Sequence, residues 1–264
     1  MKTDVLLSEY FSLNEVLRIS NFILSYEKED GGFSFSKYTP ATREDTYYAV
    51  KSLNLIDYQY KGEKVLSYII QLLSKHIMNH RNFYQLLYLI HTYDFKPQRK
   101  LMVSLIKRSE RQYHNLSDLY YYVLIMNTLN LPLPKTVYEI IMEYPAGSLR
   151  NLPNTAKYLI LLSSLNISFD EDYYLTYLKC CQSGDGGYGF LPGSTSFLEN
   201  VCYALRAHNC LQSPPDHMDR ILAFIQRCQG RRGGFGRKDV TLPTIRSTCH
   251  ALESLTLLRT FSSL

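Results

Sequence analysis

The sequence predicts an all-α protein in which six pairs of helices form a closed ring. An apolar motif recurs along the chain at similar spacing, glycine-rich turns follow amphipathic segments, and no segment of any length alternates polar and apolar residues as a strand would. With 264 residues, 45% of them hydrophobic, the chain can bury a large core. Disorder and a collagen-like fibre are therefore excluded.

The recurring motif is a short apolar anchor at the end of the second helix of each pair. It is found at residues 52–55, 92–95, 128–131, 164–167, 208–211 and 254–257. From Leu55, successive anchors follow after 40, 36, 36, 44 and 46 residues. A repeat of about 40 residues is typical of a helix pair. We therefore expect the second helices to begin near residues 43, 82, 117, 153, 197 and 245.

Glycine-rich turns separate the two helices in three of the pairs. Segments 182–188 and 229–235 share a Gln, then three residues, then Gly-Gly and an aromatic residue, and 27–33 is a third copy with Glu in place of Gln. Each follows an amphipathic segment, at 17–25, 173–181 and 218–228. Glycine commonly ends helices because it adopts left-handed backbone conformations at little cost. These segments are thus predicted to stop one helix and lead into the next.

Such repeats can stack as an open superhelix or close into a ring. The second helices are the more apolar, as at 123–126 and 158–162, whereas the first helices carry charge on one face, as at 100–111 and 219–227. Helices that are apolar on nearly all sides are usually buried. This favours a single domain over residues 1–264, closed with the second helices inside. The last pair should then pack against the first, with Leu252 and Leu255 buried.

Composition narrows the class of protein. A net charge of +5 is too small for a typical nucleic-acid binder. No segment approaches the roughly 20 apolar residues that span a bilayer, and the first residues lack the pattern of a signal peptide. We expect a cytoplasmic protein, with peripheral membrane association left open. The six cysteines lie between Cys180 and Cys249 without a C-x-x-C motif, which indicates free thiols.

The glycine-rich turns, together with Glu-Asp-Thr-Tyr-Tyr-Ala-Val-Lys-Ser-Leu at 44–53, resemble the repeats of protein prenyltransferase β subunits and of squalene and oxidosqualene cyclases. Repeats one, five and six match in sequence, and the others match in spacing only. The resemblance implies an α6/α6 toroid that handles an isoprenoid or another apolar small molecule. It favours a metal-independent, cyclase-like or transferase-like enzyme acting on a prenyl substrate.

Two alternatives remain open. A catalytically silent toroid would bind a lipid, a peptide or a partner subunit. A zinc-dependent prenyltransferase β-like subunit would need a second, helical-repeat chain. In zinc-dependent members the resemblance implies an Asp and a Cys at the start of the fifth inner helix and a His at the start of the sixth, where this chain has Asn200, Cys202 and Ser247. Since only Cys202 keeps its ligand type, we expect no zinc and no other cofactor; a rearranged site of Cys202 and His250 is the remaining metal candidate.

The resemblance to the cyclases suggests candidate acids. Segment 42–46 looks like a degraded version of their protonating motif, so Glu44 and Asp45 are the candidate catalytic residues. The alternative is that these carboxylates only complement the dipole at a helix start. Arg246, at the start of the sixth inner helix, is the candidate ligand for a phosphate.

Tyrosine is the most unusual feature of the composition, with 23 Tyr and no Trp. Several tyrosines lie near one end of the predicted inner helices, where their rings could line a prenyl-binding wall or simply fill the core. Counting eleven residues back from each anchor predicts a ring at the cavity mouth, formed by Glu44, Tyr84, Tyr120, Ala156, Asn200 and Arg246. The expected substrate-binding residues are Tyr48, Tyr84, Tyr120, Asn200, Tyr203, Arg246 and His250.

Overall fold

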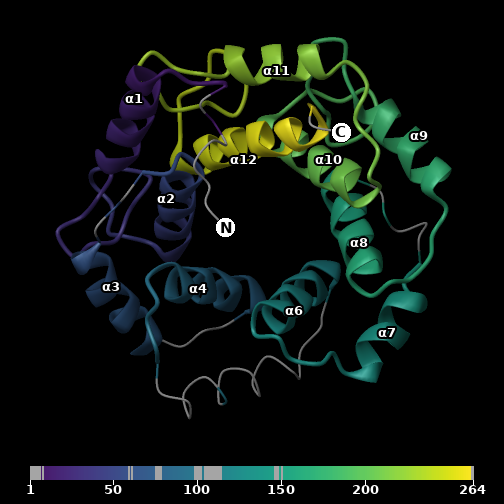
Figure 1. Cartoon of the computed structure of the whole chain (residues 1–264), viewed down its shortest axis with the longest axis horizontal. Coiled ribbons are helices and arrows are strands. Elements are labelled where there is room, and N and C mark those ends of the chain that lie inside the picture. The colour runs from purple at the N-terminus through teal and green to yellow at the C-terminus, as the bar shows by residue number, and fades with distance from the viewer. Residues whose placement is uncertain are drawn as a thin grey trace.

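The computed structural model describes residues 7, 9–58, 60, 62–74, 79–97, 103, 115–145, 149 and 151–262. Within these residues all regular secondary structure is helical, and β pairing is limited to isolated bridges such as Glu27 with Phe33. Figure 1 shows the helices arranged as two concentric layers of a ring. The all-α prediction is confirmed.

The inner layer consists of the second helix of each pair. These are α2 (Arg43–Leu55), α4 (His80–Thr92), α6 (Leu116–Thr128), α8 (Leu152–Ser164), α10 (Leu198–Cys210) and α12 (Ile245–Ser262). Each packs against the next, and α12 packs against α2, so the ring is closed (Figure 1). Leu252 and Leu255 of α12 are buried. The helix starts and the closure are therefore as predicted, and an open superhelix is excluded.

The outer layer is formed by the first helices. Those described are α1 (Leu13–Leu24), α3 (Glu63–Ser74), α7 (Lys135–Met142), α9 (Glu171–Cys181) and α11 (Met218–Arg227). The outer helix expected over 100–111 falls outside the described residues, Val103 apart. In α11, Ile221, Phe224 and Ile225 are buried, which is the spacing of one helix face, so the outer helices present an apolar stripe to the inner layer.

Local signals at both ends give the inner helices equivalent boundaries. A capping side chain accepts a hydrogen bond from the backbone N–H three residues on at Thr42, Asn79, Asn115, Asn151 and Thr244. At the other end, left-handed residues stop the helices at Asp57, Asp94, Asn130, Asn166 and Gln212. The backbone N–H of the next residue then bonds a carbonyl five residues back, as Phe95 does to Ile90 at 3.0 Å. The repeats are thus set in register by backbone hydrogen bonds.

The three glycine turns have a more specific role than stopping a helix. Gly31, Gly186 and Gly233 have φ between 85° and 97°, and a Cβ at any of them would lie 2.1 to 2.5 Å from backbone of the next outer helix. The contacts join Gly31 to Lys64 of α3, Gly186 to Arg220 of α11, and Gly233 to Arg18 of α1. Only glycine fits such an approach. Because Gly233 joins the last pair to the first, it closes the outer layer.

Candidate functional site

Equivalent boundaries place equivalent residues at the same level of the ring. We name three levels, formed by the second, sixth and ninth residues of each inner helix. Residues three or four apart lie on the same face of a helix, so the three levels follow one another along that face. The mouth level is the second residue: Glu44, Arg81, Ser117, Pro153, Glu199 and Arg246. The middle level is the sixth residue: Tyr48, Gln85, Tyr121, Lys157, Tyr203 and His250. The deep level is the ninth residue: Lys51, Tyr88, Leu124, Ile160, Arg206 and Glu253.

A cavity of about 170 Å³ lies between the inner helices. Nine of its lining residues belong to the middle and deep levels: Tyr48, Gln85, Tyr121, Tyr203, His250, Lys51, Leu124, Arg206 and Glu253. The other three precede the middle level by one residue: Tyr47, Tyr84 and Tyr120. The cavity is therefore built by the same positions of successive repeats.

A charged cluster occupies the deep level on one side of the cavity. Lys51 Nζ lies 2.7 Å from Glu253 Oε2, and Arg206 donates to Glu253 Oε1 from Nε at 2.8 Å and from Nη2 at 2.6 Å. Burial alone would raise the pKa of Glu253, but Arg206 and Lys51 hold it far below its usual value. Burial would lower the pKa of Lys51, but Glu253 holds that pKa well above its usual value. The cluster is thus fully ionised with an excess positive charge, and Glu253 cannot donate a proton.

The opposite wall, from α4 and α6, is aromatic. The rings of Tyr84 and Tyr121 lie 5.8 Å apart between centroids, and those of Tyr120 and Tyr121 lie 5.1 Å apart. Leu124 continues this wall into the deep level. Burial raises the pKa of the Tyr84 and Tyr120 phenols, so they stay protonated at neutral pH. The cavity therefore offers cations on one side and uncharged aromatic surface on the other.

Two guanidiniums share one carboxylate at the mouth. Arg81 Nη2 donates to Glu44 Oε1, and Arg246 Nη1 lies 3.7 Å from the same oxygen. Both arginines also contact Tyr48 below them: Arg81 donates to its hydroxyl at 3.3 Å, and the Arg246 guanidinium lies 5.8 Å from its ring centroid. The mouth therefore carries one more positive charge than this carboxylate neutralises.

Lys157, at the middle level, has no carboxylate partner among the described residues. Its Nζ donates to Ser117 Oγ and lies 5.8 Å from the ring centroid of Tyr203, which Arg206 approaches to 5.5 Å. Burial, with Arg81 and Arg206 nearby, lowers the pKa of Lys157 to about 8. An anion bound beside Lys157 would relieve this repulsion.

Gln85 adds an unused hydrogen-bonding group to the cavity wall. Its side chain is 2% exposed, and its Oε1 has no hydrogen-bond partner among the described residues. A buried polar atom without a partner costs about 1 to 3 kcal/mol. Because Gln85 lines the cavity, a ligand or a water in the cavity that donates a hydrogen bond to Oε1 would remove this cost.

The sequence matches one protein family, which is described as the prenyltransferase alpha-alpha toroid domain. The match covers residues 3–92 and 194–264, more than half of the chain. The chain belongs to this family. In three dimensions the toroid is similar to Candida albicans protein geranylgeranyltransferase-I complexed with GGPP, with a TM-score of 0.65 and 13% identity over 92% of this chain and 90% of that one. At this identity the likeness is one of fold. No curated protein sequence matches significantly.

Most of the expected substrate-binding residues lie in or at the cavity of the toroid. Tyr48, Tyr84, Tyr120, Tyr203 and His250 line it, and Arg246, at the mouth level, contacts the ring of Tyr48. Asn200 is different. It is 1% exposed, does not line the cavity, and neither polar atom of its side chain has a partner among the described residues.

The register of the predicted mouth ring explains the position of Asn200. Leu55 lies inside α2, three residues before Tyr58, and Tyr58 takes the structural place that Phe95 has after α4. Leu211 likewise lies two residues before its true equivalent, Ser213. Counting eleven residues back from these anchors therefore selected residues that belong to different levels of the ring. The mouth level contains Glu199 in α10, not Asn200, and Tyr84, Tyr120 and Ala156 lie one turn deeper than predicted.

The two candidate acids do not line the cavity. Glu44 is paired with Arg81 at the mouth. The Asp45 carboxylate accepts hydrogen bonds from the Thr42 hydroxyl at 2.7 Å and from the Phe35 N–H at 3.2 Å, so it binds its own loop. Burial raises the pKa of Asp45. A role for either acid in the reaction would need a ligand that reaches beyond the cavity.

The candidate metal ligands are buried and uncharged. Burial raises the pKa of the Cys202 thiol to about 12. Burial, with Arg206 and Arg246 nearby, lowers the pKa of His250 to about 3. Among the described residues no group of three or more His, Cys, Asp or Glu could hold a metal ion.

The deep charged cluster was not predicted, although the repeats contain its signal. Tyr-Ala-Val-Lys at 48–51, Tyr-Ala-Leu-Arg at 203–206 and His-Ala-Leu-Glu at 250–253 align, and each places a charged residue in an otherwise apolar helix turn. Aligning repeats one, five and six with one another, rather than with a family, would have grouped Lys51, Arg206 and Glu253. The same alignment places Tyr48, Tyr203 and His250 at one level.

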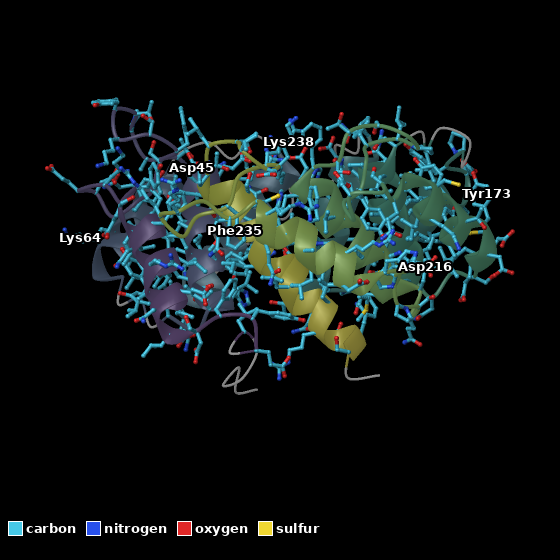
Figure 2. All side chains as sticks on the ribbon, turned by 90° about the horizontal axis from the view of Figure 1, so that it is seen from above. Asp45, Lys64, Tyr173, Asp216, Phe235 and Lys238 are labelled. Carbon is cyan, nitrogen blue, oxygen red and sulfur yellow. The ribbon has the colours of Figure 1, made fainter. Side chains whose placement is uncertain are left out.

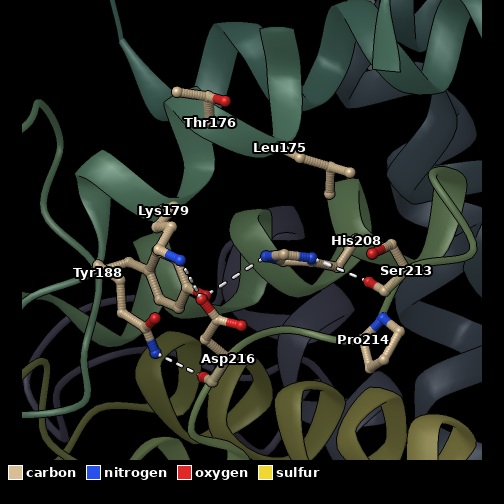
Figure 3. Close-up of a pocket in the computed structure, with 9 residues that line it drawn as sticks. Leu175, Thr176, Lys179, Tyr188, His208, Ser213, Pro214 and Asp216 are labelled. Carbon is tan, nitrogen blue, oxygen red and sulfur yellow. Dashed lines mark hydrogen bonds and ion pairs between the residues drawn. The ribbon is translucent and has the colours of Figure 1, made fainter. Parts of the chain in front are cut away.

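A second pocket, of about 230 Å³, lies at the outer layer beside α9 (Figure 3). Its polar groups already bind one another. Lys179 Nζ lies 3.0 Å from Asp216 Oδ2, and the two ring nitrogens of His208 lie 3.0 Å from the Ser213 carbonyl and 3.4 Å from the Tyr188 hydroxyl. These contacts tie the loop after α10 to the outer helix. The central cavity has the unpartnered Gln85 Oε1 in its wall, and Lys157, which has no carboxylate partner among the described residues, lies beside its wall residue Tyr203. It is therefore the better candidate for a functional site.

Proposed function

We propose that this toroid binds a short-chain prenyl diphosphate in its central cavity and transfers the prenyl group without a metal ion. The observation that carries the proposal is the excess of cations beside an aromatic wall. The three levels of the ring hold five cations, Lys51, Arg81, Lys157, Arg206 and Arg246, against three carboxylates, Glu44, Glu199 and Glu253. One of these carboxylates, Glu199, is paired outside the levels with Arg237.

Each part of a prenyl diphosphate has a matching surface. Guanidinium groups bind phosphate oxygens with two parallel hydrogen bonds, and Arg81 and Arg246 lie at the mouth above Lys157. The prenyl tail would lie against Tyr84, Tyr120 and the other aromatic residues of α4 and α6. The presence of GGPP in the structurally similar protein supports the same class of ligand.

The geometry favours transfer over protonation of an alkene. Protonation needs a neutral carboxylic acid in contact with the apolar chain, and the carboxylate that lines the cavity, Glu253, is held ionised. In transfer, the carbon–oxygen bond of the allylic diphosphate breaks, and its electron pair leaves with the diphosphate, whose charge the cations stabilise. The acceptor nucleophile then forms a bond to the prenyl carbon and loses its proton. Tyrosine ring faces stabilise the intermediate positive charge.

The small volume of the cavity favours a short prenyl chain. About 170 Å³ is less than the roughly 300 to 1,000 Å³ of pockets for drug-sized ligands. Dimethylallyl and geranyl diphosphates, which carry short chains, are therefore the first substrates to test.

Calorimetric titration with geranyl diphosphate tests the proposal. Binding is expected for the native protein, and Lys157→Met should weaken it about tenfold or more, because a charge-assisted contact is worth about 1.5 to 3 kcal/mol. Geraniol, which lacks the charge, should bind much more weakly. The melting temperature of Lys157→Met should stay close to native, since the lysine has no carboxylate partner. Absence of geranyl diphosphate binding, or equal binding by Lys157→Met, would contradict the proposal.

Turnover separates the enzyme from a silent binding toroid. With a mixture of hydroxyl, amine and thiol acceptors, the native protein should release diphosphate from geranyl diphosphate faster than the uncatalysed reaction does. Binding without release would favour the alternative, in which the toroid holds its ligand and performs no chemistry.

The affinity for geranyl diphosphate should fall as the pH rises through about 8, the pKa of Lys157. The protonated lysine binds the anion, so at one pH unit above the pKa about a tenth of the free protein is competent, and the affinity should fall about tenfold. In Lys157→Arg the charge persists, so the profile between pH 7 and 9 should be flat. The same slope in both proteins would show that another group controls binding.

Metal removal should leave binding unchanged. Two of the three positions that hold ligands in zinc-dependent relatives carry Asn200 and Ser247, so geranyl diphosphate should bind equally with and without EDTA. Elemental analysis should find no stoichiometric zinc. One zinc per chain, lost in Cys202→Ala, would instead support the zinc-dependent alternative.

A further inference from the structure

The three most exposed large apolar side chains of the described residues lie on two of three equivalent loops. We call loops 34–41, 189–197 and 236–244, which connect the glycine turns to α2, α10 and α12, the mouth loops. Tyr38 is 98% exposed, Val240 is 97% exposed and Leu242 is 87% exposed. Phe35 and Phe190 are also exposed. Other exposed apolar residues, such as Leu13 and Ile70, are on outer helices.

The mouth loops share one face of the ring. Each enters an inner helix at its first residue, next to the mouth level. Two of them also bind the start of the neighbouring inner helix: the Phe190 carbonyl accepts from the Leu152 N–H at 3.0 Å, and the Arg237 carbonyl accepts from the Leu198 N–H at 2.8 Å. Figure 2 shows Asp45 and Lys238 along the same edge of the flattened ring. The exposed apolar residues therefore lie on the face of the ring that carries the mouth level, along the side formed by α10, α12 and α2.

Hydrogen bonds within or next to each loop hold the backbone that carries these side chains. Lys28 Nζ donates to the carbonyls of Ser36 and Lys37 at 2.9 and 2.8 Å. The Thr241 hydroxyl donates to the Lys238 carbonyl at 2.7 Å and accepts from its N–H at 3.1 Å. Ser194 makes the same pair of bonds to Leu191 in the second loop. The apolar tips are thus held out from the surface by ordered turns.

Holding an apolar side chain in solvent at Val240 costs free energy in the folded chain. Its φ of 55° is in the left-handed region, which β-branched residues strongly disfavour. A glycine or asparagine there would relieve the strain, and the nearly fully exposed side chain gains no packing that could offset it. A strained backbone that displays an apolar side chain to solvent points to a role outside the folded chain.

The charge of the mouth loops indicates what they meet. Lys37 and Lys238 outnumber the single acid of these loops, Asp239, while the third basic residue, Arg237, is paired with Glu199. Basic residues beside exposed aromatic and aliphatic side chains match a surface of anionic headgroups over acyl chains. The tips are nearly fully exposed, so they stand apart rather than form the contiguous, packed patch on which a protein partner would dock.

We propose that the mouth loops dock this protein on an anionic lipid membrane, with Tyr38, Val240 and Leu242 inserted among the lipids. The cavity mouth would then face the bilayer, from which an apolar ligand could enter. The proposal does not depend on the reaction proposed above, because the binding surface is separate from the cavity.

Flotation with vesicles tests the docking surface directly. The native protein should float with phosphatidylcholine vesicles that contain phosphatidylserine, and less with phosphatidylcholine alone. A Tyr38→Ser, Val240→Ser and Leu242→Ser triple variant should lose at least about tenfold in affinity, because three apolar side chains leave the bilayer. A Leu13→Ser and Ile70→Ser control, which removes exposed apolar residues from outer helices, should bind as the native protein does. Failure of the native protein to float, or equal binding by the triple variant, overturns the proposal.

Val240→Gly separates docking from folding. The glycine removes the inserted side chain, and it also removes the backbone strain because glycine adopts the left-handed conformation at little cost. The melting temperature should therefore rise while the affinity for phosphatidylserine-containing vesicles falls. Affinity unchanged in this variant would show that Val240 does not insert and would count against the proposal.

Discussion

Glu253→Gln should lower the free energy of unfolding by about 3 kcal/mol at neutral pH. The variant leaves Lys51 and Arg206 as neighbouring cations without their shared carboxylate. Both side chains are less than a quarter exposed, so water screens them poorly. Removing one partner of a buried ion pair is costly because the remaining charge stays desolvated. Urea unfolding of the two proteins at pH 7 measures the difference.

Glu44→Gln is the matched control. It also removes one carboxylate that pairs with two cations, but its side chain is 42% exposed at the mouth. Exposed pairs contribute about 0 to 1 kcal/mol, so this variant should unfold within about 1 kcal/mol of the native protein. Equal losses for the two variants would show that the deep cluster is as well solvated as the mouth.

The effect of Glu253 should also depend on pH in a defined direction. The folded-state pKa of Glu253 is held well below its unfolded value, so its contribution is complete above the unfolded pKa of about 4.3 and is lost as the pH falls below it. The difference in stability between the native protein and Glu253→Gln should therefore shrink on acidification. A difference that grows at low pH would contradict the ionised state of Glu253.

The fold could be predicted because its determinants are local and repeated. Capping residues such as Thr42 and Asn79 start every inner helix except α10, and the apolar anchors lie near the ends, so the starts are predicted to within two residues. The ends were harder to predict. Asp57 stops α2 in the left-handed conformation, two residues beyond the predicted anchor at Leu55, and nothing in the local composition distinguishes this Asp from others.

The site could be predicted only in part because it depends on how the ring closes. Tyr48, Tyr203 and His250 could be chosen from their position near the helix starts, and they do share one level. The pairing of Lys51 with Glu253 joins residues 202 positions apart in the chain, across the contact between α2 and α12. A charged residue in an apolar helix is visible in the sequence, but its counterion is identified only once the first and last repeats are neighbours.

Gly233→Ala should destabilise the ring by about 2 to 4 kcal/mol. A left-handed conformation costs a non-glycine residue about 1 to 2 kcal/mol, and φ here is 97°. The added Cβ would also lie 2.5 Å from the Arg18 carbonyl carbon, so α1 must move away from the last glycine turn. Thermal unfolding measures the loss, and hydrogen exchange should show the largest change in α1.

Gly193→Ala isolates the effect of this contact. Gly193 is also left-handed, with φ of 73°, but a Cβ there meets nothing within 4 Å, so its substitution costs only the conformational part, about 1 to 2 kcal/mol. The additional loss in Gly233→Ala therefore measures the closure of the outer layer between the last turn and the first helix. If the two variants are equally stable, the contact with Arg18 adds nothing, and the ring is closed by the packing of α12 on α2 alone.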